Sequence, residues 1–139
     1  MSRYLLDTNV CLDAALLRSN NESALRILSA SETGQIEGII AAHVPDTIFY
    51  IIAHQIDRQA AYEVLEGLAQ TVSIGTIDQE VFTYSLQAKW KDFEDALHHF
   101  CALDNKCDAI ITRNKRDYKA SKLPVYTPEE FVTRFLTEE

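Results

Sequence analysis

Three groups of polar residues in this sequence have the types and the spacing that could support chemistry. Asp7-Thr8-Asn9 directly follows the short apolar run Tyr4-Leu5-Leu6, and Thr112-Arg113-Asn114 follows a second apolar run. Asp92 and Asp95 are three residues apart, a spacing that puts both carboxylates on one face of a helix. Clustered carboxylates repel each other and are costly to desolvate, so they persist where a divalent cation compensates their charge. Oxygen ligands without His or Cys suit Mg²⁺ or Mn²⁺.

Each acidic motif also has a purely structural interpretation. Asp92 fits an N-cap, and Asp95 then occupies the third helical position, where an acid complements the helix dipole. Asp7 could likewise serve only as a cap. What favours a functional interpretation is that all three motifs occur together. A metal held by them would activate water and stabilise the charge that develops on a phosphodiester under attack.

The apolar segments that must position these motifs alternate short strands with helices. Strands are predicted over residues 4–6, 38–41, 72–74, 108–112 and 124–126. Helices are predicted after a Thr8 or Asn9 cap, over 20–31, 45–56, 58–70 and 93–105, and from 79 and 127 onward. This pattern predicts an α/β fold of three layers, α/β/α, around a mostly parallel sheet. Two polar motifs follow strands 4–6 and 108–112, at the carboxyl ends where such sheets gather their chemistry.

Length and composition limit the class of protein. The chain has 139 residues, 47% of them hydrophobic, with 13 Lys and Arg against 21 Asp and Glu and a formal charge of −8. These values predict one folded domain over residues 1–139 and exclude a disordered chain. Without an apolar run of about 20 residues and with Asp7 interrupting any signal-peptide core, we expect a cytoplasmic protein that does not enter membranes.

The cysteines and histidines give no metal-binding motif. Three cysteines are an odd number, and none of their pairs has C-x-x-C spacing, which argues against disulfides. A structural zinc site needs four closely spaced Cys or His ligands. His98 and His99 are adjacent and would point to different faces of a helix, while His43 and His54 have no evident partner. We therefore do not expect zinc.

One segment is strongly basic in an otherwise acidic chain. Residues 113–122 carry five basic side chains against Asp117, a local charge of +4 that leaves −12 on the rest. Phosphate binding depends on local potential, so such a segment could bind RNA, although a solvated loop is the alternative. The basic residues that would contact phosphates are Arg113, Lys115, Arg116, Lys119 and Lys122.

The ordered set of motifs resembles PIN domains, whose first strand ends in Asp-Thr-Asn or Asp-Thr-Ser, as residues 4–10 do here. Residues 92–97 with Ala102 resemble their third motif, residues 108–118 their fourth block, and residues 127–131 their closing helix. Order and spacing match over nearly the whole chain. Asp-Thr-Asn alone is a weak signal, but the ordered set is strong.

The resemblance implies a metal-dependent endoribonuclease that hydrolyses phosphodiester bonds of single-stranded RNA, a fold widely represented among VapC-type toxins of toxin–antitoxin pairs. Residue by residue, it implies Asp7 and Asp95 as direct ligands of Mg²⁺ or Mn²⁺. Asn114 stands where many members have an acid and many toxins have Asn. Thr112 would hydrogen-bond to Asp7 and orient it. An antitoxin partner and a homodimer are further expectations.

The second motif departs from the family pattern. PIN domains usually place a Glu in the helix after strand two, and the alignment puts Thr47 at that position. Asp46 is adjacent but rotated by roughly 100° around a helix of ~3.6 residues per turn. Asp46 is nevertheless a candidate catalytic acid, because it is the acidic residue next to the expected position. It is also explained by its place near the helix N-terminus after Pro45, where an acid is favourable without a metal.

Two other functions compete with RNA cleavage. A PIN-fold RNA-binding or scaffold module that no longer cleaves would explain the missing Glu. A phosphoacceptor receiver domain is also acidic and α/β, but it requires an acidic pair after strand one, an Asp after a middle strand and a late strand-end Lys. After the first strand the sequence has Asp7 alone, and the 72–74 strand is followed by Gly75-Thr76 rather than by an Asp.

Overall fold

A computed structural model describes residues 1–18 and 21–136. Its centre is a parallel sheet of five strands in the order β3-β2-β1-β4-β5. The strands are β1 (Arg3–Leu6), β2 (Glu37–Ala41), β3 (Ser73–Gly75), β4 (Ala109–Ile111) and β5 (Val125–Tyr126). β1 lies in the middle and pairs with β2 on one side and β4 on the other, with Leu6 opposite Ile111. The residues that follow β1 and β4 therefore emerge side by side at one edge of the sheet.

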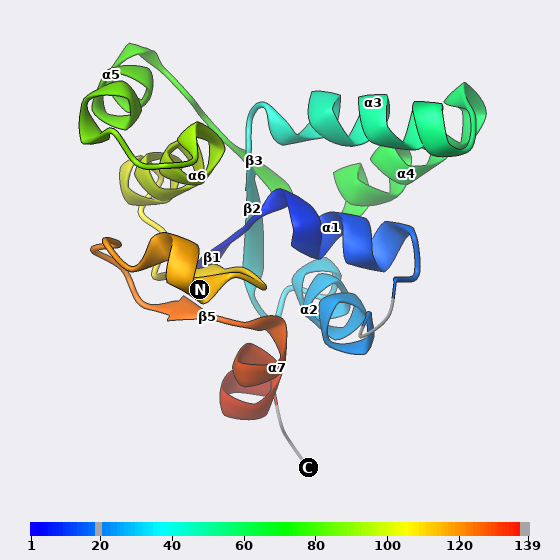
Figure 1. The fold of residues 1–139 in the computed structure, drawn as a ribbon. Coiled ribbons are helices and arrows are strands. Elements are labelled where there is room, and N and C mark those ends of the chain that lie inside the picture. The colour runs from blue at the N-terminus through cyan, green and yellow to red at the C-terminus, as the bar shows by residue number, and fades with distance from the viewer. Residues whose placement is uncertain (19–20, 137–139) are drawn as a thin grey trace.

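Helices cover both faces of the sheet, as Figure 1 shows. They are α1 (Thr8–Ala15), α2 (Glu22–Glu32), α3 (Val44–Gln55), α4 (Arg58–Thr71), α5 (Gln79–Ala88), α6 (Phe93–Asp104) and the short α7 (Pro128–Phe131). The first four lie on one side of the strands, and α5 and α6 lie on the other. A 3-10 turn, η1 (Lys115–Tyr118), follows β4, and a π-helical turn, η2 (Val132–Leu136), follows α7. The predicted three-layer α/β/α fold is confirmed.

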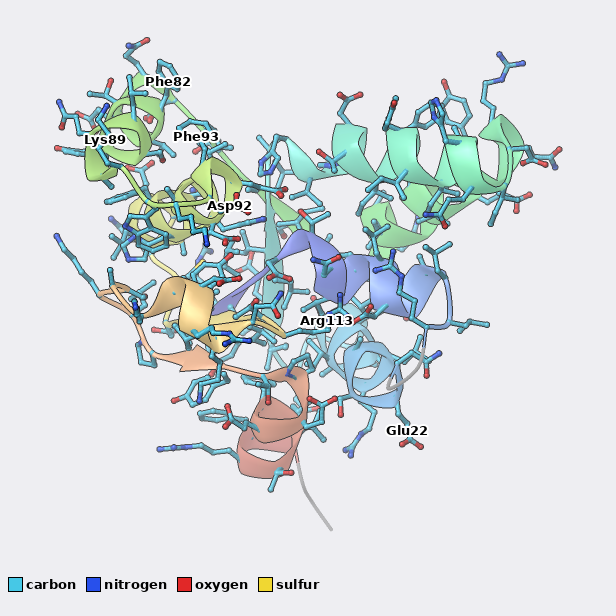
Figure 2. All side chains as sticks on the ribbon, viewed as in Figure 1. Glu22, Phe82, Lys89, Asp92, Phe93 and Arg113 are labelled. Carbon is cyan, nitrogen blue, oxygen red and sulfur yellow. The ribbon has the colours of Figure 1, made fainter. Side chains whose placement is uncertain are left out.

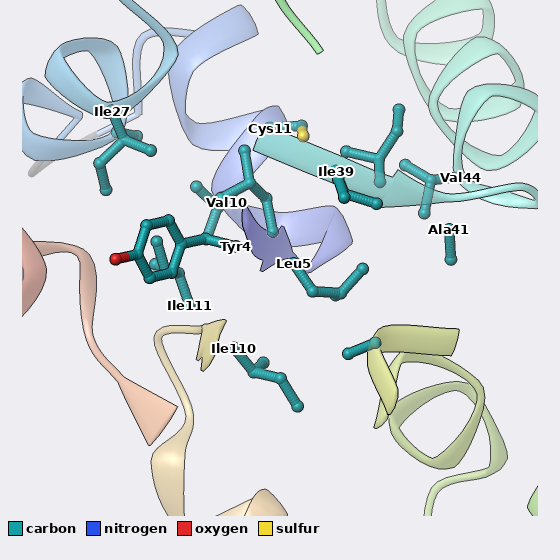
Figure 3. Close-up of a cluster of buried hydrophobic side chains, with 14 of the residues drawn as sticks. Tyr4, Leu5, Val10, Cys11, Ile27, Ile39, Ala41, Val44, Ile110 and Ile111 are labelled. Atoms are coloured by element: carbon teal, nitrogen blue, oxygen red, sulfur yellow. The ribbon is translucent and has the colours of Figure 1, made fainter. Parts of the chain in front are cut away.

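The core lies on both faces of β1 and its neighbours (Figure 3). Leu5 on β1 and Ile110 on β4 are fully buried, and Ile39 on β2 is almost so. Strands that are buried on both faces have continuous apolar sequences. Short apolar runs were therefore sufficient to locate these strands. None of the helices in the described ranges combines the length and the apolar character needed to cross a membrane.

The predicted elements agree with the structure apart from their ends. The helix predicted over 20–31 begins at Glu22; its predicted first residue, Asn20, lies outside the described residues. The closing helix has the predicted cap, in which the Thr127 hydroxyl accepts from the Glu130 amide and the Glu130 carboxylate accepts from the Thr127 amide. One cap prediction was wrong: Asp7, not Thr8 or Asn9, caps α1.

Candidate active site

Asp7 is held at the carboxyl end of β1 by contacts from two elements. Its Oδ1 accepts a hydrogen bond from the Val10 amide at 3.2 Å, the N-cap contact of α1. Its Oδ2 accepts one from the Thr112 hydroxyl at 2.5 Å. Thr112 follows β4, and its own amide donates to the Tyr126 carbonyl at the neighbouring strand. The side chain of Asp7 is thus fixed in a buried position, and the structure places Thr112 where the sequence predicted.

Asp95 reaches the same edge of the sheet from the first turn of α6. Asp92 caps this helix, because its Oδ1 accepts from the amides of Glu94 at 2.8 Å and Asp95 at 3.4 Å. The Asp95 Oδ1 accepts a hydrogen bond from the hydroxyl of buried Tyr118 at 3.2 Å. Tyr118 belongs to η1, so the basic segment after β4 helps to position a carboxylate. No motif or spacing along the chain predicts this role for Tyr118.

Both carboxylates are in an environment that disfavours their charge. Burial raises the pKa of Asp7, although the charge of His98 and the Thr112 hydrogen bond act in the opposite direction. Burial, followed by the nearby charge of Asp92, raises the pKa of Asp95 to about 6, and the charge of Asp7 adds to this effect. Within the described part of the chain, no Lys or Arg forms a salt bridge with either carboxylate. The pair therefore lacks a Lys or Arg partner among these residues, and His98 is the group whose positive charge opposes the effect of burial.

The other predicted catalytic residues are less closely joined to this pair. The amide of Asn114 donates to the Thr112 hydroxyl at 3.1 Å, which places the residue beside Asp7, but its exposed side chain makes no cap contact. Asp46 is exposed on α3 and lines a separate shallow hollow with Thr47 and Tyr50. Its carboxylate forms no hydrogen bond or ion pair with the residues that the structure describes, and Thr47 bonds back to the His43 carbonyl at 3.3 Å.

A second cluster beside the carboxylates was not predicted. His43 Nε2 lies 2.9 Å from Glu94 Oε2, and His98 Nε2 lies 3.6 Å from the same oxygen. The Thr8 hydroxyl donates to that oxygen at 2.8 Å. The hydrogen bonds with His43 and His98 hold the pKa of Glu94 well below its usual range. The sequence signal was the Glu94-x-x-x-His98 spacing, which puts the two on one helix face; the contribution of His43 depends on the fold.

The basic segment is a 3-10 turn rather than a simple loop, and two of its cations are already paired. Figure 2 shows Arg113 beside α1, where its Nε lies 3.3 Å from the buried carboxylate of Asp13. Lys115 Nζ lies 3.1 Å from Glu130 Oε1. These contacts tie the segment to α1 and α7, and they reduce its capacity to bind phosphate.

Two of the three remaining cations of the segment border a hollow that contains Asp95, and Lys122 is not among its lining residues. This hollow has a volume of about 830 Å³ and opens between the start of α6 and η1. Arg116 and Lys119 line it from the basic segment, and Lys91 lines it from the chain before α6. Trp90 and Phe93 supply aromatic rings that could stack on bases. Asp92 and Asp117 line it together with Asp95, so the lining combines aromatic surface with three cations and three carboxylates.

Comparisons with solved structures agree on the fold. A toxin–antitoxin complex from Klebsiella pneumoniae is 25% identical, covers 90% of this chain and 97% of its own, and has a TM-score of 0.64. DNA-bound VapBC from Salmonella typhimurium is 14% identical, with coverages of 92% and 99% and a TM-score of 0.72. The sarcin–ricin loop cleaving toxin VapC20 from Mycobacterium tuberculosis is 11% identical, with coverages of 77% and 86% and a TM-score of 0.63.

The comparison with family models identifies the family. A search among curated protein sequences finds no match. The family model of the PIN domain, in contrast, matches residues 3–116, which include β1 through β4 and the beginning of η1. That range contains Asp7, Asp95 and Thr112, the residues joined at the carboxyl edge of the sheet. By this match and by its fold, the chain belongs to the PIN domain family.

Proposed function

We propose that this chain is a VapC-type endoribonuclease that uses Mg²⁺ or Mn²⁺ to hydrolyse phosphodiester bonds of single-stranded RNA. The observation that carries the proposal is that Asp7 and Asp95 are both hydrogen-bonded to residues that follow β4, with Asp95 in a hollow that Arg116 and Lys119 also line. The carboxylates supply a site for a metal, and the hollow supplies a site for the RNA backbone.

The donor set fits the proposed ion. The two carboxylates are hard oxygen donors, the kind that Mg²⁺ and Mn²⁺ prefer, and the amide oxygen of Asn114 would be a third donor of the same kind. When bound, such an ion activates water and stabilises the charge of a phosphodiester under attack. Because only two carboxylates are secure here and Asp46 lies exposed on α3, we expect a weaker metal site than one built from four acids.

Other residues of the chain would position the two carboxylates and bind the RNA. Thr112 fixes the carboxylate of Asp7, and Tyr118 fixes that of Asp95. Burial strongly raises the pKa of Tyr118, so its phenol keeps its proton and acts as a donor, not as a base. Arg116 and Lys119 would hold the phosphates on either side of the scissile bond, and the aromatic rings of the hollow would hold the bases.

The relatives support a partner as well as an activity. The Klebsiella structure is a toxin–antitoxin complex, the Salmonella structure is VapBC bound to DNA, and the Mycobacterium protein is a toxin that cleaves the sarcin–ricin loop. We therefore extend the proposal to a toxin that is neutralised by an antitoxin protein. A homodimer and a cytoplasmic location remain predictions from the sequence.

Cleavage of a fluorescent single-stranded RNA tests this function. Wild-type protein with millimolar Mn²⁺ should cleave it, and EDTA should abolish the activity. Asp7→Asn should lower the cleavage rate by at least about 100-fold. Loss of a residue that only supports a metal ligand lowers activity by about 10- to 100-fold, so a larger effect indicates a direct ligand. Asp57→Asn, which alters an exposed N-cap on α4 far along the chain, is the matched control and should cleave normally.

The absence of a secured third carboxylate favours a second candidate, a PIN-fold module that binds RNA without cleaving it. Thr47 stands where the family usually has Glu, and among the described residues the carboxylate of Asp46 has no partner that would hold it at the site. If RNA binds with the same affinity in EDTA and in Mn²⁺ and stays intact in both, this second candidate replaces the first.

A further inference from the structure

The cluster of His43, Glu94 and His98 is built from two elements that meet at the carboxyl edge of the sheet. His43 is the N-cap residue of α3, and Glu94 and His98 are one turn apart on α6. One nitrogen or oxygen from each residue lies within 4.8 Å of those of the other two. Ligands about 2 Å from one ion lie about 3.3 Å apart in a tetrahedral site. The distances from Glu94 Oε2 to Nε2 of His43 and of His98, 2.9 and 3.6 Å, lie on either side of that value.

The three side chains differ in burial, from the core outward. His98 is 1% exposed, and the side chains of His43 and Glu94 are 26% and 39% exposed. The cluster is therefore closed on the side of the core and open on the other. The Thr8 hydroxyl donates a hydrogen bond to Glu94, which fixes the carboxylate in the way that supporting residues fix metal ligands.

The two nitrogens of each imidazole have different surroundings. Nδ1 of His43 and Nδ1 of His98 are buried, and neither has a hydrogen-bond partner in the described part of the chain. The Glu94 carboxylate, which can only accept, favours a proton on Nε2 of both rings while no ion is bound. Without a metal, an Nε2 proton can be donated to Glu94. With a metal, the proton resides on Nδ1 and Nε2 becomes a ligand.

We propose that His43, Glu94 and His98 bind a transition-metal ion of the Zn²⁺ or Co²⁺ class, next to the Asp7–Asp95 pair. Two imidazoles and one carboxylate form a ligand set that suits Zn²⁺ and its neighbours in the first row far better than Mg²⁺. Three protein ligands leave one tetrahedral position open toward solvent. Thr8 and Glu94 are the chain neighbours of Asp7 and Asp95, so the two ligand sets adjoin while differing in chemistry.

Metal binding itself, measured without RNA, tests this site independently of the proposed function. Metal-free wild-type protein should bind one Zn²⁺ per chain in calorimetry, and Co²⁺ should give the intense visible absorption of a four-coordinate site. His43→Ala should weaken Zn²⁺ binding at least 10-fold and remove that absorption. Glu94→Gln should do the same. Circular dichroism verifies that both variants fold.

Two control variants separate this site from the rest of the protein. His54→Ala alters an exposed histidine near the end of the same helix α3, whose Nδ1 contacts only the Tyr50 carbonyl, and should bind Zn²⁺ as the wild type does. Asp95→Asn should keep the Co²⁺ absorption while weakening Mn²⁺ binding at the carboxylate pair. Unchanged Zn²⁺ affinity in both folded His43→Ala and Glu94→Gln, or loss of the Co²⁺ absorption in Asp95→Asn alone, would overturn the proposal.

Discussion

At the scale of single residues, the site depends on short polar contacts between segments that are distant in sequence. Thr112 contacts Asp7 across 105 positions, and Tyr118 contacts Asp95 across 23. The Thr112 contact was predicted only because the family resemblance implied it. The Tyr118 and His43 contacts were not, because no spacing along the chain indicates that a turn after β4 or the cap of α3 reaches α6.

Removing the Thr112 hydroxyl should weaken the site without removing a ligand. Thr112→Val keeps the side-chain volume but takes away the hydrogen bond that helps to lower the pKa of Asp7. The pKa of Asp7 then rises, so the ionised carboxylate forms only at higher pH. We expect Mn²⁺ affinity to fall about 10- to 100-fold at neutral pH, as for other supporting residues. Calorimetric titration measures this, with Thr112→Ser as the conservative control.

The dependence of Mn²⁺ affinity on pH is a more specific test, in particular the acidic limb, where affinity falls as Asp7 becomes protonated. In Thr112→Val this limb should move to higher pH, whereas Thr112→Ser should leave it in place. A valine variant that binds Mn²⁺ with wild-type affinity across the pH range would show that the Thr112–Asp7 contact serves stability alone.

At the scale of elements, the basic segment shows what charge patterning can and cannot predict. Five cations in residues 113–122 are visible in the sequence, but their availability is set by the fold. Arg113 is committed to Asp13 and Lys115 to Glu130, while Arg116 and Lys119 face the hollow beside Asp95. Helices and strands were predictable because their apolar periodicity is local. Which of these cations are paired was not predictable, because the partners Asp13 and Glu130 are distant in sequence.

The paired variant Arg116→Ala with Lys119→Ala should weaken RNA binding through lost phosphate contacts. Each contact to single-stranded nucleic acid contributes about 0.7 to the slope of log affinity against log salt, so the slope should become shallower by up to about 1.4. Fluorescence anisotropy with a short RNA at several salt concentrations measures it. Arg58→Ala, an exposed cation at the start of α4, is the control and should retain the wild-type slope.

Arg113 is unsuitable for the same test, since its loss leaves buried Asp13 with Arg18 as its remaining cation at 3.5 Å. If the paired variant binds RNA with unchanged affinity and slope, Arg116 and Lys119 belong to a solvated surface, and the proposed nuclease must bind its substrate elsewhere.

At the scale of the whole molecule, the fold and the carboxylate pair were predictable, and the detailed electrostatics were not. Strands buried on both faces and a parallel order bring the ends of β1 and β4 together, so Asp7 and Thr112 had to meet. The second motif was harder: its family position holds Thr47, and the side chain that faces the site from this region is His43. A local alignment cannot show this contact, because His43 lies one helical turn before Thr47 and its partner Glu94 is on another helix.

The site also affects the stability of the whole protein in a pH-dependent way. The pKa of Asp95 is about 6 in the folded protein, against about 3.9 in an unfolded chain. Between these values the folded state binds more protons, so the free energy of unfolding falls as pH rises from about 4 to about 6. Glu94, whose pKa is lowered, acts in the opposite direction, but its contribution cancels when two variants that both retain it are compared.

Asp95→Asn should therefore stabilise the metal-free protein at neutral pH. The variant cannot ionise at this position, and its amide oxygen can still accept the Tyr118 hydrogen bond. In EDTA its melting temperature should exceed that of the wild type by a few degrees at pH 7.5, and the difference should shrink as pH falls from 6 to 4. Millimolar Mn²⁺ should raise the wild-type melting temperature and narrow the gap, because the ion compensates the charge that the wild type carries. Thermal melts with and without EDTA measure both effects. A difference that is constant from pH 4 to 7.5 would mean that Asp95 is not held in a charge-disfavouring environment, and the argument for a metal at the Asp7–Asp95 pair would lose its electrostatic basis.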